Sequence, residues 1–131
     1  MVRALLIATA IVETATGAGL LLAPAMPVSL LLGATLEGSV ATIVARVLGA
    51  ALVALGLVCW LARDDFSSPA SRGLVAGLLF YDVAAPALLA FAWLGPELRG
   101  VALWPAVVAH AALAMWCAGC LLGGHGEGAL R

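Results

Sequence analysis

Long apolar runs alternate along the chain with short segments of proline, glycine or charge, and this pattern predicts four membrane-spanning helices. A helix needs about 20 apolar residues to cross roughly 30 Å of hydrocarbon. Four runs reach that length, at about residues 4–23, 40–62, 73–94 and 102–122. Barrel strands are excluded because their alternating polar and apolar pattern is missing. The expected fold is all-α, an integral membrane four-helix bundle in a single domain.

The segments between and after these runs have their own expected roles. Residues 24–39 form an outer loop, and its stretch SLLLG predicts a short helix that lies at the interface or dips back into the bundle. Residues 123–131 are expected to form a flexible tail. A cleaved signal peptide is the alternative for the first run, with LAPA as its cleavage site, but the run is too long and has Glu13 at its centre.

Composition supports the membrane assignment and restricts the partners. Hydrophobic residues make up 65% of the chain and charged residues only 10%, whereas a soluble domain is usually about a quarter charged. Six basic residues against seven acidic ones provide no basic surface for nucleic acid. The expected partners are the lipid bilayer and either a second copy of the chain or another membrane protein.

Arginine placement predicts the orientation. Arg3, Arg63, Arg72 and Arg131 fall on one side of the predicted membrane, and only Arg99 falls in a loop on the other side. Positive charge in short loops stays on the cytoplasmic side. Both termini are therefore expected in the cytoplasm. All six basic residues are arginine, which is typical of a GC-rich bacterial genome and favours a bacterial inner membrane.

Each predicted span carries one ionisable residue near the same depth. These are Glu13, Arg46, Asp82 and His110, roughly 9–18 Å below the outer ends of their helices at about 1.5 Å per residue. A charged side chain at the centre of a span costs about 2.5–3.5 kcal/mol. We therefore expect all four to turn inward and form one cluster, which is neutral if His110 is protonated. If His110 is neutral, one acid is expected to hold a proton.

Neighbouring residues add to the predicted cluster. Tyr81 adjoins Asp82, and Pro86 follows four residues later, so no N–H returns to the Asp82 carbonyl. Carboxylate, phenol and free carbonyl make this turn the most site-like part of the chain. Small and hydroxyl-bearing residues share faces with the charged groups and favour close helix contacts. They are Thr9, Thr16 and Gly17, then Thr42, Gly49, Ala50 and Gly56, and finally Gly73 and Gly77.

The cysteines allow a second chemistry. Cys117 and Cys120 stand one helical turn apart, a spacing found in redox pairs and in half of a metal site. A closed metal site needs four ligands; Cys59 lies at a similar depth but on the second span, and His110 stands two helical turns away from Cys117, so these residues are not expected to complete one. We favour small apolar packing for these thiols, with thiol redox chemistry as the alternative, and we expect no metal and no cofactor.

Two stretches carry a resemblance to known families. The run Ala45–Arg63 and the stretch ALWPAVVAHAAL, Ala102–Leu113, resemble small four-span bacterial membrane proteins that are DoxX-like in outline. That resemblance implies the fold and no catalytic residues. A membrane-centred Glu13 in the first of four spans is similar to small multidrug resistance transporters, whose first-helix glutamate exchanges protons for cationic drugs. The chain departs from them by adding Arg46, Asp82 and His110.

Three functions follow as hypotheses. The first is a structural or accessory membrane subunit whose charge network fixes the arrangement of the helices, without enzymatic activity. The second is a proton-coupled carrier or binding protein for a small solute, using the cluster of ionisable residues. The third is a quinone- or thiol-linked redox enzyme built on Cys117 and Cys120.

Overall fold

The computed structural model describes residues 1–65, 68–95 and 98–123, and throughout this part the regular structure is helical. Four of the helices are long and apolar enough to cross a membrane. This confirms the predicted all-helical fold, with four helices of sufficient length and apolar character to span a membrane. In chain order the helices are α1 (Val2–Leu22), α2 (Ala25–Leu32), α3 (Ser39–Ala62), α4 (Pro69–Trp93) and α5 (Leu103–Gly123). Residues 124–131, most of the predicted tail, lie outside the described residues.

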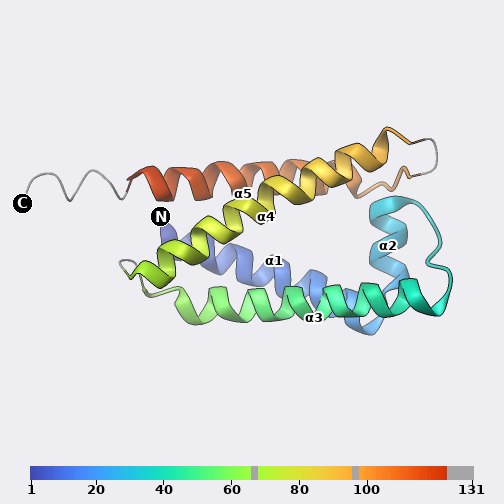
Figure 1. The fold of residues 1–131 in the computed structure, drawn as a ribbon, viewed down its shortest axis with the longest axis horizontal. Helices are drawn as coiled ribbons and strands as arrows, with labels where there is room; N and C mark the ends of the chain where they lie inside the picture. The colour runs from blue at the N-terminus through green and yellow to red at the C-terminus, as the bar shows by residue number, and fades with distance from the viewer. Residues whose placement is uncertain (66–67, 96–97, 124–131) are drawn as a thin grey trace, which may run out of the picture.

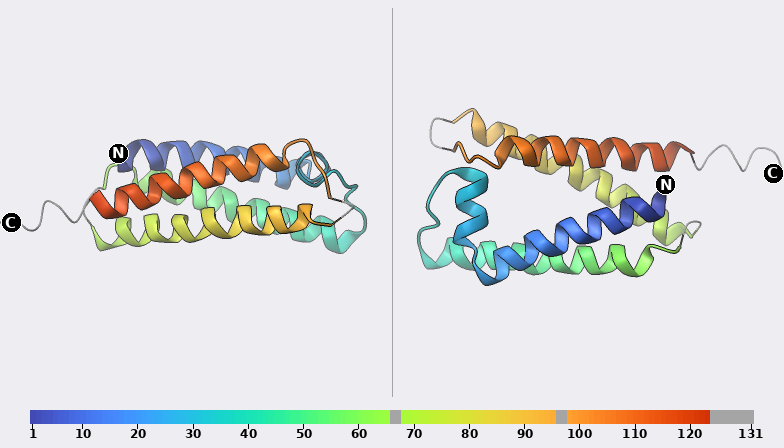
Figure 2. Two further views of the ribbon diagram at one scale, coloured as in Figure 1. Left: turned by 90° about the horizontal axis from the view of Figure 1, so that it is seen from above. Right: turned by 180° about the vertical axis from the view of Figure 1, so that it is seen from behind.

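The four long helices run side by side along the long axis of the molecule, and α2 lies across one end of them (Figure 1). The N-terminus and the end of α5 lie together at the opposite end (Figure 2). At about 1.5 Å per residue, the 24 residues of α3 cover about 36 Å, enough to cross the hydrocarbon. The predicted spans and the observed helices differ most at α4, which begins at Pro69 because Ser68 caps it and proline suits a first helical position.

The short helix α2 occupies the segment that was predicted as an outer loop. It ends at Gly33, whose left-handed conformation with φ of 73° favours glycine. The Gly33 N–H donates to the Ser29 carbonyl at 2.8 Å. Figure 1 shows α2 crossing the bundle axis, the orientation of an interfacial helix.

Helices α1 and α3 form one closely packed pair, and α4 and α5 form the other. Glycines make the first pair possible. A Cβ atom on Gly17 would lie 2.6 Å from the Gly49 carbonyl oxygen, and one on Gly49 would lie 2.7 Å from the Gly17 carbonyl oxygen. The two backbones therefore touch at a point where no larger residue fits.

A hydrophobic core joins the two helix pairs in the half of the molecule that holds the N-terminus. Its buried members come from all four long helices: Leu5, Leu6, Ala10, Cys59, Val75, Leu78 and Cys117. At that end Asp64 accepts ion pairs from Arg3 at 3.2 Å and from Arg63 at 3.5 Å. Two carboxyl groups lie next to this core, and they define the candidate site.

Candidate functional site

Glu13 on α1 and Asp82 on α4 are the buried carboxyl groups of the described chain, with 2% and 1% of their surface exposed. Burial of both follows from the helix faces on which they lie. Glu13 shares its face with Thr9 and Gly17, and Asp82 follows Val75 and Leu78 on the buried side of α4. A carboxyl group in such an environment needs a hydrogen-bond partner or a proton.

Asp82 has its partner on the neighbouring helix. Its Oδ1 atom lies 2.8 Å from Nδ1 of His110 on α5. Its Oδ2 atom accepts a long contact, 4.0 Å, from the Cys117 thiol on the same helix. Asp82 therefore connects α4 to α5 through both of its oxygen atoms.

Tyr81 links this pair to Glu13. Its ring meets the His110 imidazole edge to face, with 5.4 Å between the ring centroids. Its hydroxyl interacts with the Glu13 carboxyl group, which is also close enough to His110 and Asp82 for electrostatic interaction. The cluster thus runs from Glu13 through Tyr81 and His110 to Asp82, and it joins one helix pair to the other.

Two buried oxygen atoms of α1 remain without a hydrogen-bond partner in the described residues. They are Oε1 of Glu13 and Oγ1 of Thr9. Thr9 is 1% exposed. The two residues stand four positions apart, so their side chains lie on one face of α1. An unpaired buried oxygen atom costs free energy unless a proton, a water molecule or a ligand satisfies it, so this face is where the cluster would accept one of them.

Arg46 does not join the cluster, and this corrects the sequence prediction. Its side chain is exposed, and within the described residues it has no ion pair. The buried positions of α3 are Ala45, Gly49, Leu52, Gly56 and Cys59. Arg46 follows the first of these by one residue, which turns it about 100° around the helix and away from Glu13.

The α3 residue that does lie beside the cluster is Cys59. It is fully buried, packs in the same core as Cys117, and interacts electrostatically with Glu13 and Asp82. The repeat of three and four residues from Ala45 to Cys59 is the sequence signal that could have identified it. Cys59, Cys117 and Cys120 are all free thiols.

The arrangement favours proton chemistry over metal binding. The described residues contain no group of three or more His, Cys, Asp or Glu side chains that could hold a metal ion. The cluster instead places four groups next to one another in space that can bind and transfer protons: the Glu13 carboxyl, the Tyr81 phenol, the His110 imidazole and the Asp82 carboxyl. Pro86, predicted to free the Asp82 carbonyl, lies within a continuous α4.

Among known proteins, no family model, curated protein or solved structure matches this chain. The resemblances to DoxX-like proteins and to small multidrug resistance transporters therefore stay predictions from the sequence.

Proposed function

We propose that the protein is a proton-coupled carrier or binding protein for small cationic solutes in a bacterial inner membrane, with Glu13 as the exchanging group. The observation that carries this proposal is the buried Glu13 carboxyl group, whose Oε1 atom has no partner among the described residues. Within the described residues, the groups that act on its carboxyl group are His110, Asp82 and Tyr81, whereas Arg46 is exposed. The likeness to small multidrug resistance transporters supports the same role for Glu13.

The net charge of Glu13, Asp82 and His110 suggests how a proton and a cation could exchange. Two carboxyl groups face one imidazole, so the cluster is neutral when His110 is protonated and one acid holds a proton. Two carboxyl groups at close quarters do not both ionise readily. Loss of the proton from Glu13 leaves one negative charge, which an entering cation can balance. Proton release and cation binding are then alternatives at one site.

A second candidate function rests on the Asp82–His110 pair. Its 2.8 Å contact ties α4 to α5 and has the geometry of a structural clasp. A structural or accessory subunit would need this pair and would make no use of the unpaired oxygen atom of Glu13. The proposed carrier uses both, with Asp82 and His110 positioning Tyr81 against Glu13. One bundle of four helices encloses little space, so we propose a second copy of the chain as its partner.

Exchange in reconstituted vesicles tests the proposal. Protein is placed in vesicles with an acidic interior and a trapped pH-sensitive dye, and impermeant organic cations, beginning with methyl viologen, are added outside. We expect the interior to become less acidic as protons leave in exchange for the cation. Glu13→Gln should abolish the response, because an amide cannot release a proton.

Glu37→Gln is the matched control, because Glu37 is exposed and its carboxylate accepts a hydrogen bond from Thr35. This variant should exchange as the unmodified protein does. An equal response in Glu13→Gln, or no response to any cation with folded protein, would contradict the proposal.

A further inference from the structure

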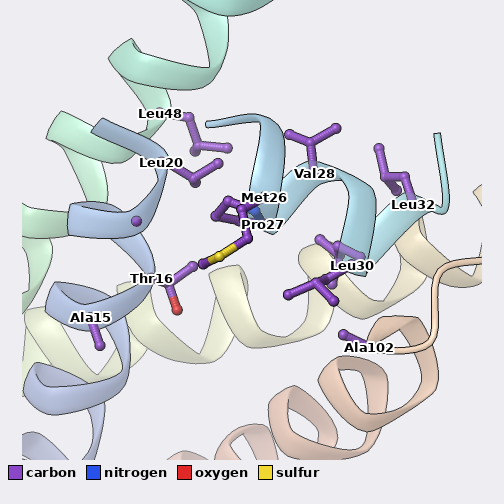
Figure 3. A pocket seen from close by; sticks show the side chains of 12 residues that line it. Ala15, Thr16, Leu20, Met26, Pro27, Val28, Leu30, Leu32, Leu48 and Ala102 are labelled. Atoms are coloured by element: carbon purple, nitrogen blue, oxygen red, sulfur yellow. The ribbon is translucent and has the colours of Figure 1, made fainter. Parts of the chain in front are cut away.

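A cavity of about 470 Å³ lies under α2, apart from the Glu13 cluster. It is a half-open hollow lined by residues of α1 and α2, by Leu48 of α3 and by Ala102, the residue before α5. Figure 3 shows Met26 reaching from α2 toward Thr16 of α1, with Leu48 and Leu20 on one side and Leu30 and Ala102 on the other. Its volume is within the range of small-molecule sites, about 300–1,000 Å³.

The roof of this cavity is held in place by backbone contacts. The Ala102 N–H donates to the Leu30 carbonyl at 2.9 Å. A Cβ atom on Gly33 would lie 2.8 Å from the Arg99 carbonyl carbon, and one on Gly100 would collide with the backbone of Leu30 and Leu31. Helix α2 therefore rests directly on the chain that leads into α5, so the cavity is formed before any ligand arrives.

The described lining of the cavity is apolar except at one point. It contains no charged side chain, and Thr16 provides its one hydroxyl group. Within the described residues this hydroxyl makes no hydrogen bond to another group. Such a lining excludes ions and phosphate head groups, because nothing would replace their hydration.

We propose that this cavity binds one hydrocarbon chain that ends in a small neutral hydrogen-bonding group, such as a long-chain alcohol, which enters from the bilayer. The chain fills the apolar space under α2, and its end group exchanges a hydrogen bond with Thr16. This goes beyond the proposed function, because Glu13 is not part of the lining. Failure of cation exchange would leave this inference standing.

A second hollow in the same molecule serves as a control for binding under α2. This hollow, about 550 Å³, lies on the outer face of the α1–α3 pair and includes Ile11, Val53 and Trp60. Helix α2 contributes nothing to its lining. The second hollow also contains a threonine, Thr14. If an apolar hollow with one threonine were enough to bind the chain, both hollows would therefore bind it equally.

Photolabelling with hexadecanol that carries a diazirine tests the proposal on the full chain in phosphatidylcholine nanodiscs. After illumination, mass spectrometry should find the label on α2 and around Thr16. Thr16→Val should lower labelling about three- to tenfold through loss of one hydrogen bond. Thr16→Phe should abolish it by filling the cavity, while Ile11→Phe should leave it unchanged. Both positions are exposed, and the helical circular dichroism signal verifies folding.

Three results would overturn the inference. One is equal labelling of the same residues by a diazirine phosphatidylcholine, which would make the occupant ordinary bilayer lipid. Another is full labelling in Thr16→Val or Thr16→Phe. The third is an equal loss in Ile11→Phe, which would place the label in the outer hollow.

Discussion

At the scale of single residues, Asp82 and His110 form a close polar contact inside the bundle, with 2.8 Å between Oδ1 and Nδ1. Asp82 is 1% exposed and the His110 side chain 16% exposed, so water screens their interaction little. Removing one partner of a buried pair leaves the other without compensation, at a cost of about 3–5 kcal/mol. Replacing both with apolar residues of similar volume removes the uncompensated group as well.

We therefore expect Asp82→Leu or His110→Leu alone to lower the free energy of unfolding by about 3–5 kcal/mol, and the double variant to recover most of the loss. Unfolding in mild detergent, followed by circular dichroism, measures all three. Additive losses would show that the two side chains act independently. That outcome would contradict a structural role for the Asp82–His110 pair.

Part of this cluster follows from sequence alone. Glu13, Asp82 and His110 could be predicted to face inward because each interrupts an apolar run at a similar depth. Arg46 met the same criterion and is nevertheless exposed. The position of a residue in the sequence fixes its depth along a helix. The direction of its side chain depends on which face of the helix packs against other helices. On α3 the buried face is the one that contains Gly49 and Gly56. Cys59 belongs to that face, so the repeat of three and four residues was the signal in the sequence for its inward position.

At the scale of helices, glycines with similar spacing have opposite surroundings. Gly49 lies against the backbone of α1, where an added Cβ would be 2.8 Å from the Leu21 nitrogen. Gly73 and Gly77 on α4 have nothing within 4 Å of such a Cβ. The sequence predicted close contacts at both places, because spacing alone does not say whether a small-residue face meets a helix or lipid.

This contrast predicts the effect of adding one methyl group. Gly49→Ala should lower the free energy of unfolding by about 1–3 kcal/mol, because backbone atoms cannot move aside as side chains do. Gly77→Ala should leave it unchanged or raise it by up to about 1 kcal/mol, through better helix propensity. Thermal unfolding of the two variants compares them directly. Equal effects would mean that α1 and α3 do not cross at Gly49.

At the scale of the whole molecule, the candidate site lies between two helix pairs. Glu13 belongs to the α1–α3 pair, while Tyr81, Asp82 and His110 belong to the α4–α5 pair. A small shift of one pair against the other would change the surroundings of Glu13 without breaking the Asp82–His110 contact. This is the arrangement that a carrier needs to expose one site alternately.

The arginines at one end of the bundle predict its orientation in the membrane. Arg3 and Arg63 share Asp64 at the end that holds the N-terminus, and such charge stays in the cytoplasm. A fluorescent protein fused at the C-terminus should therefore fluoresce in bacterial cells. Alkaline phosphatase fused after Glu37, between α2 and α3, should be active because that loop is expected to face outward. The reverse pattern would invert the topology.

The central claim is that Glu13 takes up and releases a proton inside the membrane. Infrared spectroscopy of the reconstituted protein during a pH titration tests it most directly, through the carbonyl stretch of a protonated carboxyl group. We expect a band that appears and disappears reversibly with pH, is missing in Glu13→Gln, and persists in Glu37→Gln. A folded protein without a titrating band, or a band that Glu13→Gln leaves intact, would contradict it.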